Sequence, residues 1–146
     1  MISYTGSVYR LIFTDQDATS PVQSPEGRFH HSGQMAIYTS LSAEGCGVAI
    51  KRYLTPDDAP RHIVPLEVTL ERVVDIRGQS AASAVWQDSR AAGHPAPTWA
   101  FSDQARADGA QALMYSSRSR PDLTHLTLFT TAPDAVRLAG QSIPFP

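Results

Sequence analysis

The stretch Val64–Ile76, VPLEVTLERVVDI, decides the fold class of this chain. In its first half, apolar side chains alternate with Pro65, Glu67 and Thr69, which is the period-two pattern of a strand with one buried face. Because proline cannot donate a ladder hydrogen bond, Pro65 places the start of this strand at an edge or a bulge. We therefore expect a β-strand that continues to the end of the stretch.

Further strands are predicted on both sides of this stretch. The segment Ser7–Thr14, SVYRLIFT, alternates two sets of side chains in the same period-two pattern. The segment that follows it, Asp15–Gly27, contains two prolines and is expected to be irregular. The other predicted strands are Met35–Ser40, Ala112–Ser116, Leu123–Thr130 and a last one within Val136–Phe145.

Helical patterns are confined to three segments. Ser42–Leu54 has a serine that can cap its start, and Thr55-Pro56 ends it. Thr98–Asp108 stops at Gly109, whereas Ser80–Ala92 is less regular. Strands dominate, and neither a regular strand–helix alternation nor a glycine-rich dinucleotide fingerprint is present. The sequence therefore predicts an α+β fold with a mixed or antiparallel sheet and few helices.

Length and composition exclude several classes of protein. The 146 residues suit one domain, 1–146, and 42% hydrophobic with 18% charged residues exclude intrinsic disorder and a coiled coil. A net charge of −2 gives no general attraction to nucleic acid or to an anionic membrane. No signal peptide and no apolar stretch of about 20 residues is visible. The single cysteine, Cys46, excludes an internal disulfide, so we expect a cytoplasmic protein.

The histidines show no spacing typical of metal ligands, so no metal site is expected. The motifs GxSxG, HExxH and the P-loop are also missing. A small hydrolase that uses His30 or His31 stays open as an alternative.

Four separated residues are the remaining candidates for a functional site. Arg10 lies on an otherwise apolar strand, Arg28 lies in a glycine-bounded turn, and Tyr38 and Ser117 lie on or after short strands. An arginine fork matches a phosphate or a carboxylate. Each residue also has a structural interpretation: Arg10 in an ion pair, Tyr38 in the core, and Ser117 as the cap of a turn.

Taken together and in order, the segments that carry these residues resemble the RES domain, the toxin half of RES–Xre toxin–antitoxin modules. The similarity extends from about Val8 to Phe129 and depends on order and spacing rather than on one motif. The matching segments are VYRLIF (8–13), PEGRFHHSG (25–33), MAIYTS (35–40), SAEGCGVAIKRYL (42–54) and LMYSSRSRPDLTHLTLF (113–129).

The resemblance implies an ADP-ribosyltransferase-like fold and an enzyme that consumes NAD, by cleaving it with water or phosphate or by transferring ADP-ribose to a protein. Arg28 matches the family arginine and Ser117 the family serine. Tyr9 and Arg10 match the basic position of the first strand, and Tyr38 matches the strand tyrosine. The resemblance also implies an Xre-type antitoxin as partner, which covers the NAD cleft and contacts operator DNA itself.

The chain departs from the family at the catalytic glutamate, whose position is Ala49. Glu44 is the only acid in that helix, and at 100° per residue it points about 140° away from Ala49. The Trp-Asn pair that follows the family arginine is replaced by Phe29-His30. Two interpretations follow: an inactivated form of an NAD-consuming toxin, or a natural variant that uses another acid or has lost catalysis. A variant without catalysis would be a binding module that keeps the cleft without turnover.

Overall fold

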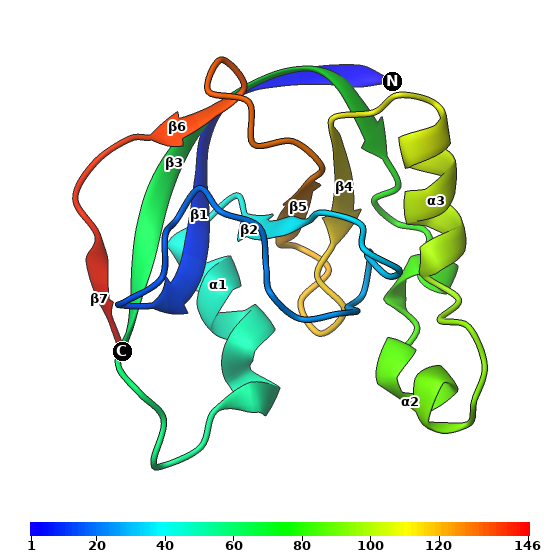
Figure 1. The fold of residues 1–146 in the computed structure, drawn as a ribbon, viewed down its shortest axis with the longest axis horizontal. Coiled ribbons are helices and arrows are strands. Elements are labelled where there is room, and N and C mark those ends of the chain that lie inside the picture. The colour runs from blue at the N-terminus through cyan, green and yellow to red at the C-terminus, as the bar shows by residue number, and fades with distance from the viewer.

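The structure is a computed structural model that describes residues 1–146. Its sheet is built on two long antiparallel strands. Strand β1 covers Ile2–Phe13 and strand β3 covers Arg61–Asp75, and the two pair along nearly their whole length, with one irregularity near Tyr4. They run together across the molecule (Figure 1). The long strand predicted from Val64–Ile76 is confirmed and begins slightly earlier.

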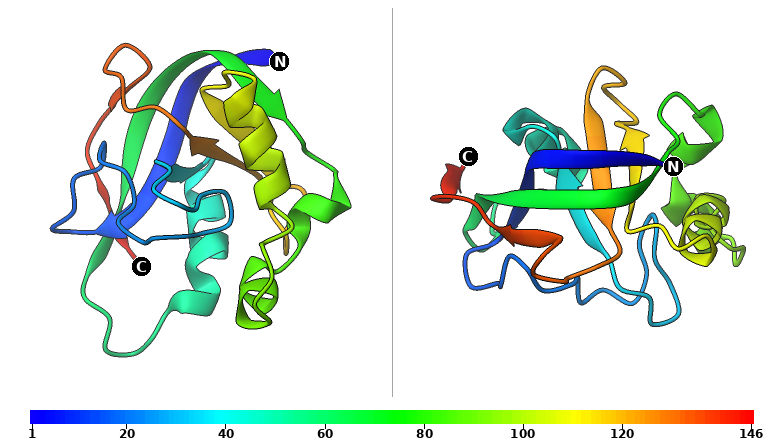
Figure 2. Two further views of the ribbon diagram at one scale, coloured as in Figure 1. Left: turned by 45° about the vertical axis from the view of Figure 1, so that its right-hand side comes forward. Right: turned by 90° about the horizontal axis from the view of Figure 1, so that it is seen from above.

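Three shorter strands complete a ring. They are β2 (Ile37–Ser40), β4 (Ala112–Ser116) and β5 (Thr124–Leu128). The order is β1-β2-β5-β4-β3, and because β3 also pairs with β1, the hydrogen-bonded path returns to its start. The β3–β4 pair is parallel and the other pairs are antiparallel. The views in Figure 2 show β1 and β3 side by side with the shorter strands beneath them. The mixed sheet is as predicted.

The tail differs from the single strand expected within Val136–Phe145. It forms two three-residue strands, β6 (Val136–Leu138) and β7 (Ile143–Phe145), which both pair with β3. Pro65 of β3 lies between the two pairings, and its carbonyl accepts a hydrogen bond from the Ala139 amide at 3.2 Å. Because the proline nitrogen has no hydrogen to donate on that side, the ladder is interrupted there.

The helices are short and lie outside the ring (Figure 1). The first begins after Ser42, whose hydroxyl accepts from the Gly45 amide at 3.0 Å, and the last ends before Gly109, which has a φ of 79°. None is long and apolar enough to cross a membrane. The elements are α1 (Ala43–Ile50), the 3₁₀ turns η1 (Lys51–Tyr53) and η2 (Ser80–Ser83), α2 (Trp86–Ala91) and α3 (Trp99–Ala107).

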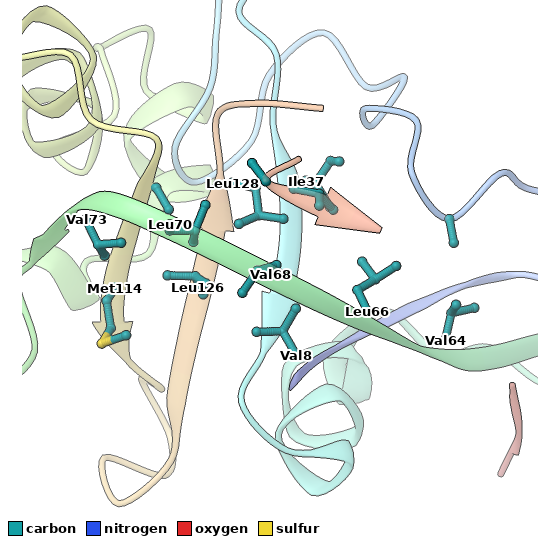
Figure 3. Close-up of a cluster of buried hydrophobic side chains, with 14 of the residues drawn as sticks. Val8, Ile37, Val64, Leu66, Val68, Leu70, Val73, Met114, Leu126 and Leu128 are labelled. Atoms are coloured by element: carbon teal, nitrogen blue, oxygen red, sulfur yellow. The ribbon is translucent and has the colours of Figure 1, made fainter. Parts of the chain in front are cut away.

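The inside of the ring holds the main hydrophobic core (Figure 3). Every strand of the ring contributes, because alternate side chains of each strand point inward. Burying one such Val or Leu side chain contributes roughly 1.5–3 kcal/mol relative to leaving it exposed. The buried side chains labelled in Figure 3 are Val8, Ile37, Val64, Leu66, Val68, Leu70, Val73, Met114, Leu126 and Leu128.

The intervening side chains of β2, β5 and β4 point to the outer face of the ring. Part of this face is covered by a second apolar cluster, in which Leu113 and Tyr115 of β4 meet Phe29 and the α3 residue Ala105. The rest carries polar side chains, including His125 of β5. This outer face supplies the floor of the candidate site.

Candidate functional site

A cavity of about 970 Å³ lies over the outer face of β2, β5 and β4. Helix α1 with η1 forms one wall, and the segment that leads into α2 forms another. The turn after β4 and the segment 22–30 complete it. The polar and charged residues that line it are Ser24, Glu26, Arg28, His30, Tyr38, Thr39, Ser40, Lys51, Arg52, Tyr53, Gln87, Tyr115, Ser117, Arg118, Ser119 and His125.

A tight turn places Arg28 on this cavity. The Gly27 amide donates to the His30 carbonyl at 2.9 Å, and the turn rests on Tyr38 of β2. The Tyr38 hydroxyl accepts from the Phe29 amide at 2.9 Å and lies 2.7 Å from His30 Nδ1. A Cβ at Gly27 would meet the His30 ring at 2.5 Å and the Tyr38 hydroxyl at 2.9 Å, so the close approach requires glycine.

The Arg28 guanidinium is partly buried and has no carboxylate partner in the chain. Its Nη2 donates to the Ala82 carbonyl at 2.6 Å, and its Cζ lies 4.7 Å from the centroid of the Tyr115 ring. Burial lowers the pKa of Arg28, because the charged form is partly removed from water. The remaining donors of the fork are therefore available to an anion in the cavity.

Tyr38 and Ser117 line the same cavity, with part of their polar groups already used. The Tyr38 hydroxyl already binds the turn that contains Arg28, so only the Tyr38 ring is available to contact a ligand. Burial raises the pKa of Tyr38. The Ser117 hydroxyl, 3% exposed, accepts from the Arg120 amide at 3.3 Å and so caps the turn after β4. Ser117 therefore caps a turn, as its structural interpretation predicts, and also lines the cavity.

The cavity has an excess of positive charge. Lys51, Arg52 and Arg118 line it and form no ion pair in the chain. Its lining carboxylate, Glu26, is engaged by Arg90, with 3.0 Å between Oε1 and Nε. An anionic ligand therefore suits the cavity better than a cationic one.

Ala49 lies on the cavity wall and is exposed to it. Glu44, in the first turn of the same helix, does not line the cavity and lies 3.5 Å from Arg120 at the surface. The expected divergence of these two positions on α1 is therefore present in the structure. A side chain longer than alanine at position 49 would extend into the cavity.

Arg10, expected to bind the ligand, does not line the cavity. Arg10 lies two residues from both Val8 and Ile12 and therefore shares their face of β1. Its side chain points into the ring, on the other side of β1 from the cavity. The residue is 4% exposed, and burial lowers the pKa of Arg10 to about 10. Its Nη1 donates to three backbone carbonyls, those of Ala18 (2.7 Å), Ser20 (2.6 Å) and Asp17 (3.4 Å).

Tyr9 is also outside the cavity lining. Its carbonyl accepts a hydrogen bond from the Cys46 thiol at 3.2 Å, which ties β1 to α1. Tyr9 and Arg10 thus lie outside the cavity lining, whereas Arg28, Tyr38, Ala49 and Ser117 come together on one cavity.

The adjacent histidines have separate environments. His30 is buried, with Nε2 2.9 Å from the Ser24 carbonyl in addition to its contact with Tyr38. His31 stacks on Trp99 outside the cavity, with Nε2 3.0 Å from Asp103. No three His, Cys, Asp or Glu side chains lie close enough together to hold a metal ion.

His125 is the lining residue that the sequence analysis considered only as a metal ligand. It is 5% exposed, and burial together with the Arg28 charge lowers the pKa of His125 to about 4. The alternation of β5 contained a signal, because His125 and Thr127 occupy the positions between the core residues Leu126 and Leu128.

Comparisons with known proteins identify the family and the fold of the chain. A family model described as the RES domain matches residues 7–146. A chain in the crystal structure of the M. tuberculosis MbcT–MbcA toxin–antitoxin complex has a similar structure, with a TM-score of 0.74 and 21% sequence identity. The match covers 99% of this chain and 86% of that chain. The sequence comparison with curated proteins gives no match. At 21% identity, the structural similarity establishes a common fold.

Proposed function

This chain belongs to the RES domain family, and from that membership we propose that it is the toxin component of a toxin–antitoxin pair and that its cavity takes NAD. Consumption of NAD is what the resemblance to RES proteins implies. The similarity in fold to a chain of a toxin–antitoxin complex supports the same proposal.

The observation that carries the proposal is the Arg28 fork on a cavity without a free carboxylate. NAD has a pyrophosphate group with two negative charges, which a bidentate guanidinium binds well. Lys51, Arg52 and Arg118 add positive charge along the same cavity. The volume of about 970 Å³ is at the upper end of ordinary ligand pockets, and aromatic rings on its lining offer stacking surfaces for the bases.

The chemistry that the family implies breaks the bond between nicotinamide and the ribose. Nicotinamide leaves with the bonding electrons, and the positive charge that develops on the ribose needs a nearby carboxylate. Water, phosphate or a protein side chain then bonds to the same carbon. The chain has Ala49 at the glutamate position, and Glu26 is engaged by Arg90. These two facts favour a second candidate function, a module that binds the nucleotide without turnover.

One substitution separates binding from cleavage. We expect the chain to bind NAD in calorimetry and Ala49→Glu to raise nicotinamide release by about 10²–10³-fold, by analogy with the loss of one charge-stabilising group from an active site. Expression of Ala49→Glu should also arrest bacterial growth. The matched control is Glu44→Ala, which should change neither quantity because Glu44 does not line the cavity.

Two results would contradict this proposal. Rapid nicotinamide release by the unmodified chain would show that another residue supplies the acid. An Ala49→Glu protein that folds and binds NAD without releasing nicotinamide would leave only the binding module.

We further propose a partner, an Xre-type antitoxin that covers the cavity in the cytoplasm and that alone contacts operator DNA. The cavity mouth offers an apolar surface for it, since Tyr53 is 50% exposed and the adjacent Leu54 is 43% exposed. Co-expression with the neighbouring antitoxin gene should give one complex on size-exclusion chromatography that no longer binds NAD. Separate elution of the two proteins at micromolar concentration would count against the partner.

A further inference from the structure

His125 occupies the middle of the cavity floor. In the strand register it lies opposite Ser40 of β2 and Tyr115 of β4, and both of these residues also line the cavity. Because opposite residues of antiparallel strands point to the same face, the three side chains form a row across the floor. The imidazole is therefore held by regular β-structure rather than by a mobile loop.

The imidazole has no hydrogen-bond partner within the chain. The neighbours in the row use their own polar groups elsewhere: the Ser40 hydroxyl donates to the Thr124 carbonyl at 3.2 Å, and the Tyr115 hydroxyl lies 2.9 Å from that of Thr127. The influences on the pKa of His125 are burial and the charge of Arg28, with no hydrogen bond among them. The buried side-chain nitrogens that lack a partner are His62 Nε2 and Arg106 Nε, so the His125 nitrogens still reach the open cavity, where a ligand can pair with them.

At neutral pH this imidazole is uncharged, because its pKa is lowered to about 4. A neutral imidazole carries one donor and one acceptor, which matches a hydroxyl group. It has no charge to offer a phosphate. The adjacent Arg28 has that charge, so the two side chains suit different parts of one ligand.

Tyr115 relates the two groups in space. The Arg28 Cζ lies 4.7 Å from the centroid of the Tyr115 ring, and the centroid of the His125 ring lies 5.6 Å from the same point. In a nucleotide, the sugar is bonded directly to the phosphate. A phosphate on Arg28 therefore brings a ribose within reach of His125.

We propose that His125 hydrogen-bonds a ribose hydroxyl of the ligand whose phosphate is bound by Arg28, and so makes the cavity select ribosylated phosphates over phosphate alone. The inference rests on the proposed function, because it assumes that the cavity takes NAD or ADP-ribose. It adds the residue that recognises the sugar and the orientation of the ligand along the floor.

The test compares three ligands on three proteins by calorimetry. The ligands are NAD, ADP-ribose and inorganic pyrophosphate, and the proteins are the unmodified chain, His125→Leu and His125→Asn. His125→Leu replaces the imidazole by an apolar side chain of similar size. We expect it to weaken the binding of NAD and ADP-ribose about tenfold and to leave the affinity for pyrophosphate unchanged. His125→Asn keeps one donor and one acceptor and should retain most of the affinity.

Equal affinity of His125→Leu and the unmodified chain for ADP-ribose would overturn the inference, and so would an equal loss for pyrophosphate, which indicates a structural role. Failure of the unmodified chain to bind NAD or ADP-ribose would overturn the proposed function and this inference together. If His125→Leu does not fold, ¹⁵N resonances of the His125 ring in the unmodified chain decide. A shift with ADP-ribose but not with pyrophosphate supports the inference, and the same response to both overturns it.

Discussion

Arg10 and Arg28 are two arginines shielded from water, and neither forms an ion pair. Burial lowers the pKa of both guanidinium groups. Arg10 nevertheless closes one end of the ring, where three backbone carbonyls surround its Nη1. Arg28 has one protein carbonyl, two aromatic rings and an open cavity. Burial of a charge alone therefore does not identify a binding residue. A buried charge indicates a binding site when some of its hydrogen-bond donors have no partner within the chain.

The difference follows from the two faces of the ring. Arg10 shares the inner face with Val8 and Ile12, so its charge meets the dry core and must be satisfied by the chain itself. The segment that contains Ala18 folds over it and supplies the carbonyls. Arg28 lies outside the ring, where the cavity leaves part of the fork unsatisfied.

Replacing each arginine by alanine should give the largest changes in stability and in affinity for NAD. Arg10→Ala removes the donor from three backbone carbonyls, of which that of Ala18 is buried, so we expect the free energy of unfolding to fall by about 3 kcal/mol, with unchanged affinity for NAD. Arg28→Ala removes a charge-assisted contact worth roughly 1.5–3 kcal/mol and should weaken the binding of NAD about ten- to a hundredfold. Its loss of stability should be smaller than that of Arg10→Ala. Urea unfolding and calorimetry measure the two quantities.

The opposite pattern would reverse the assignment of the two residues. If Arg10→Ala lost NAD binding while it stayed folded, the ligand would extend to the end of the ring. If Arg28→Ala mainly unfolded the protein, its contact with Ala82 would be its principal role.

Local chemistry was sufficient to predict most elements of the fold. The alternation in Val64–Ile76, the cap at Ser42 and the stop at Gly109 each act within a few residues, and each is present in the structure. There were two exceptions, the helix predicted over Ser80–Ala92, which is divided into η2 and α2, and the tail. The division of the tail into β6 and β7 depends on Pro65, which is far away in the sequence and meets the tail only after folding.

The site was less accessible to local arguments. The sequence already shows that Arg10 shares a face with Val8, but which face bears the cavity depends on the closure of β1 against β3. The resemblance to RES proteins identified Arg28 and Ala49, and both line the cavity. His125 was overlooked because the alternation of β5 separates it from the core residues but does not show that its face bears a cavity. Its importance comes from its place on the cavity floor near Arg28, which is a property of the folded chain.

Lysine substitutions should give the smallest effects and the sharpest distinction. All three contacts of Arg10 come from Nη1, whose two hydrogens are shared among the three carbonyls. An ammonium group carries three hydrogens, so one nitrogen can still serve the carbonyls. Arg10→Lys should therefore cost about 1 kcal/mol of stability or less, apart from the shorter reach of lysine. Arg28 instead uses Nε and Nη2 for the Ala82 carbonyl and leaves other donors for the ligand.

A single ammonium group cannot reproduce both sides of the Arg28 fork. We expect Arg28→Lys to keep the attraction between charges but to weaken NAD about three- to tenfold, between the unmodified chain and Arg28→Ala. Calorimetry against NAD at two salt concentrations is the measurement, because the charge that remains should keep the affinity dependent on salt. If Arg28→Lys binds NAD as tightly as arginine, the fork is not what the ligand recognises, and Arg28 acts only as a charge. If Arg10→Lys unfolds the protein while Arg28→Lys is fully stable, the geometry of the guanidinium matters more inside the ring than on the cavity.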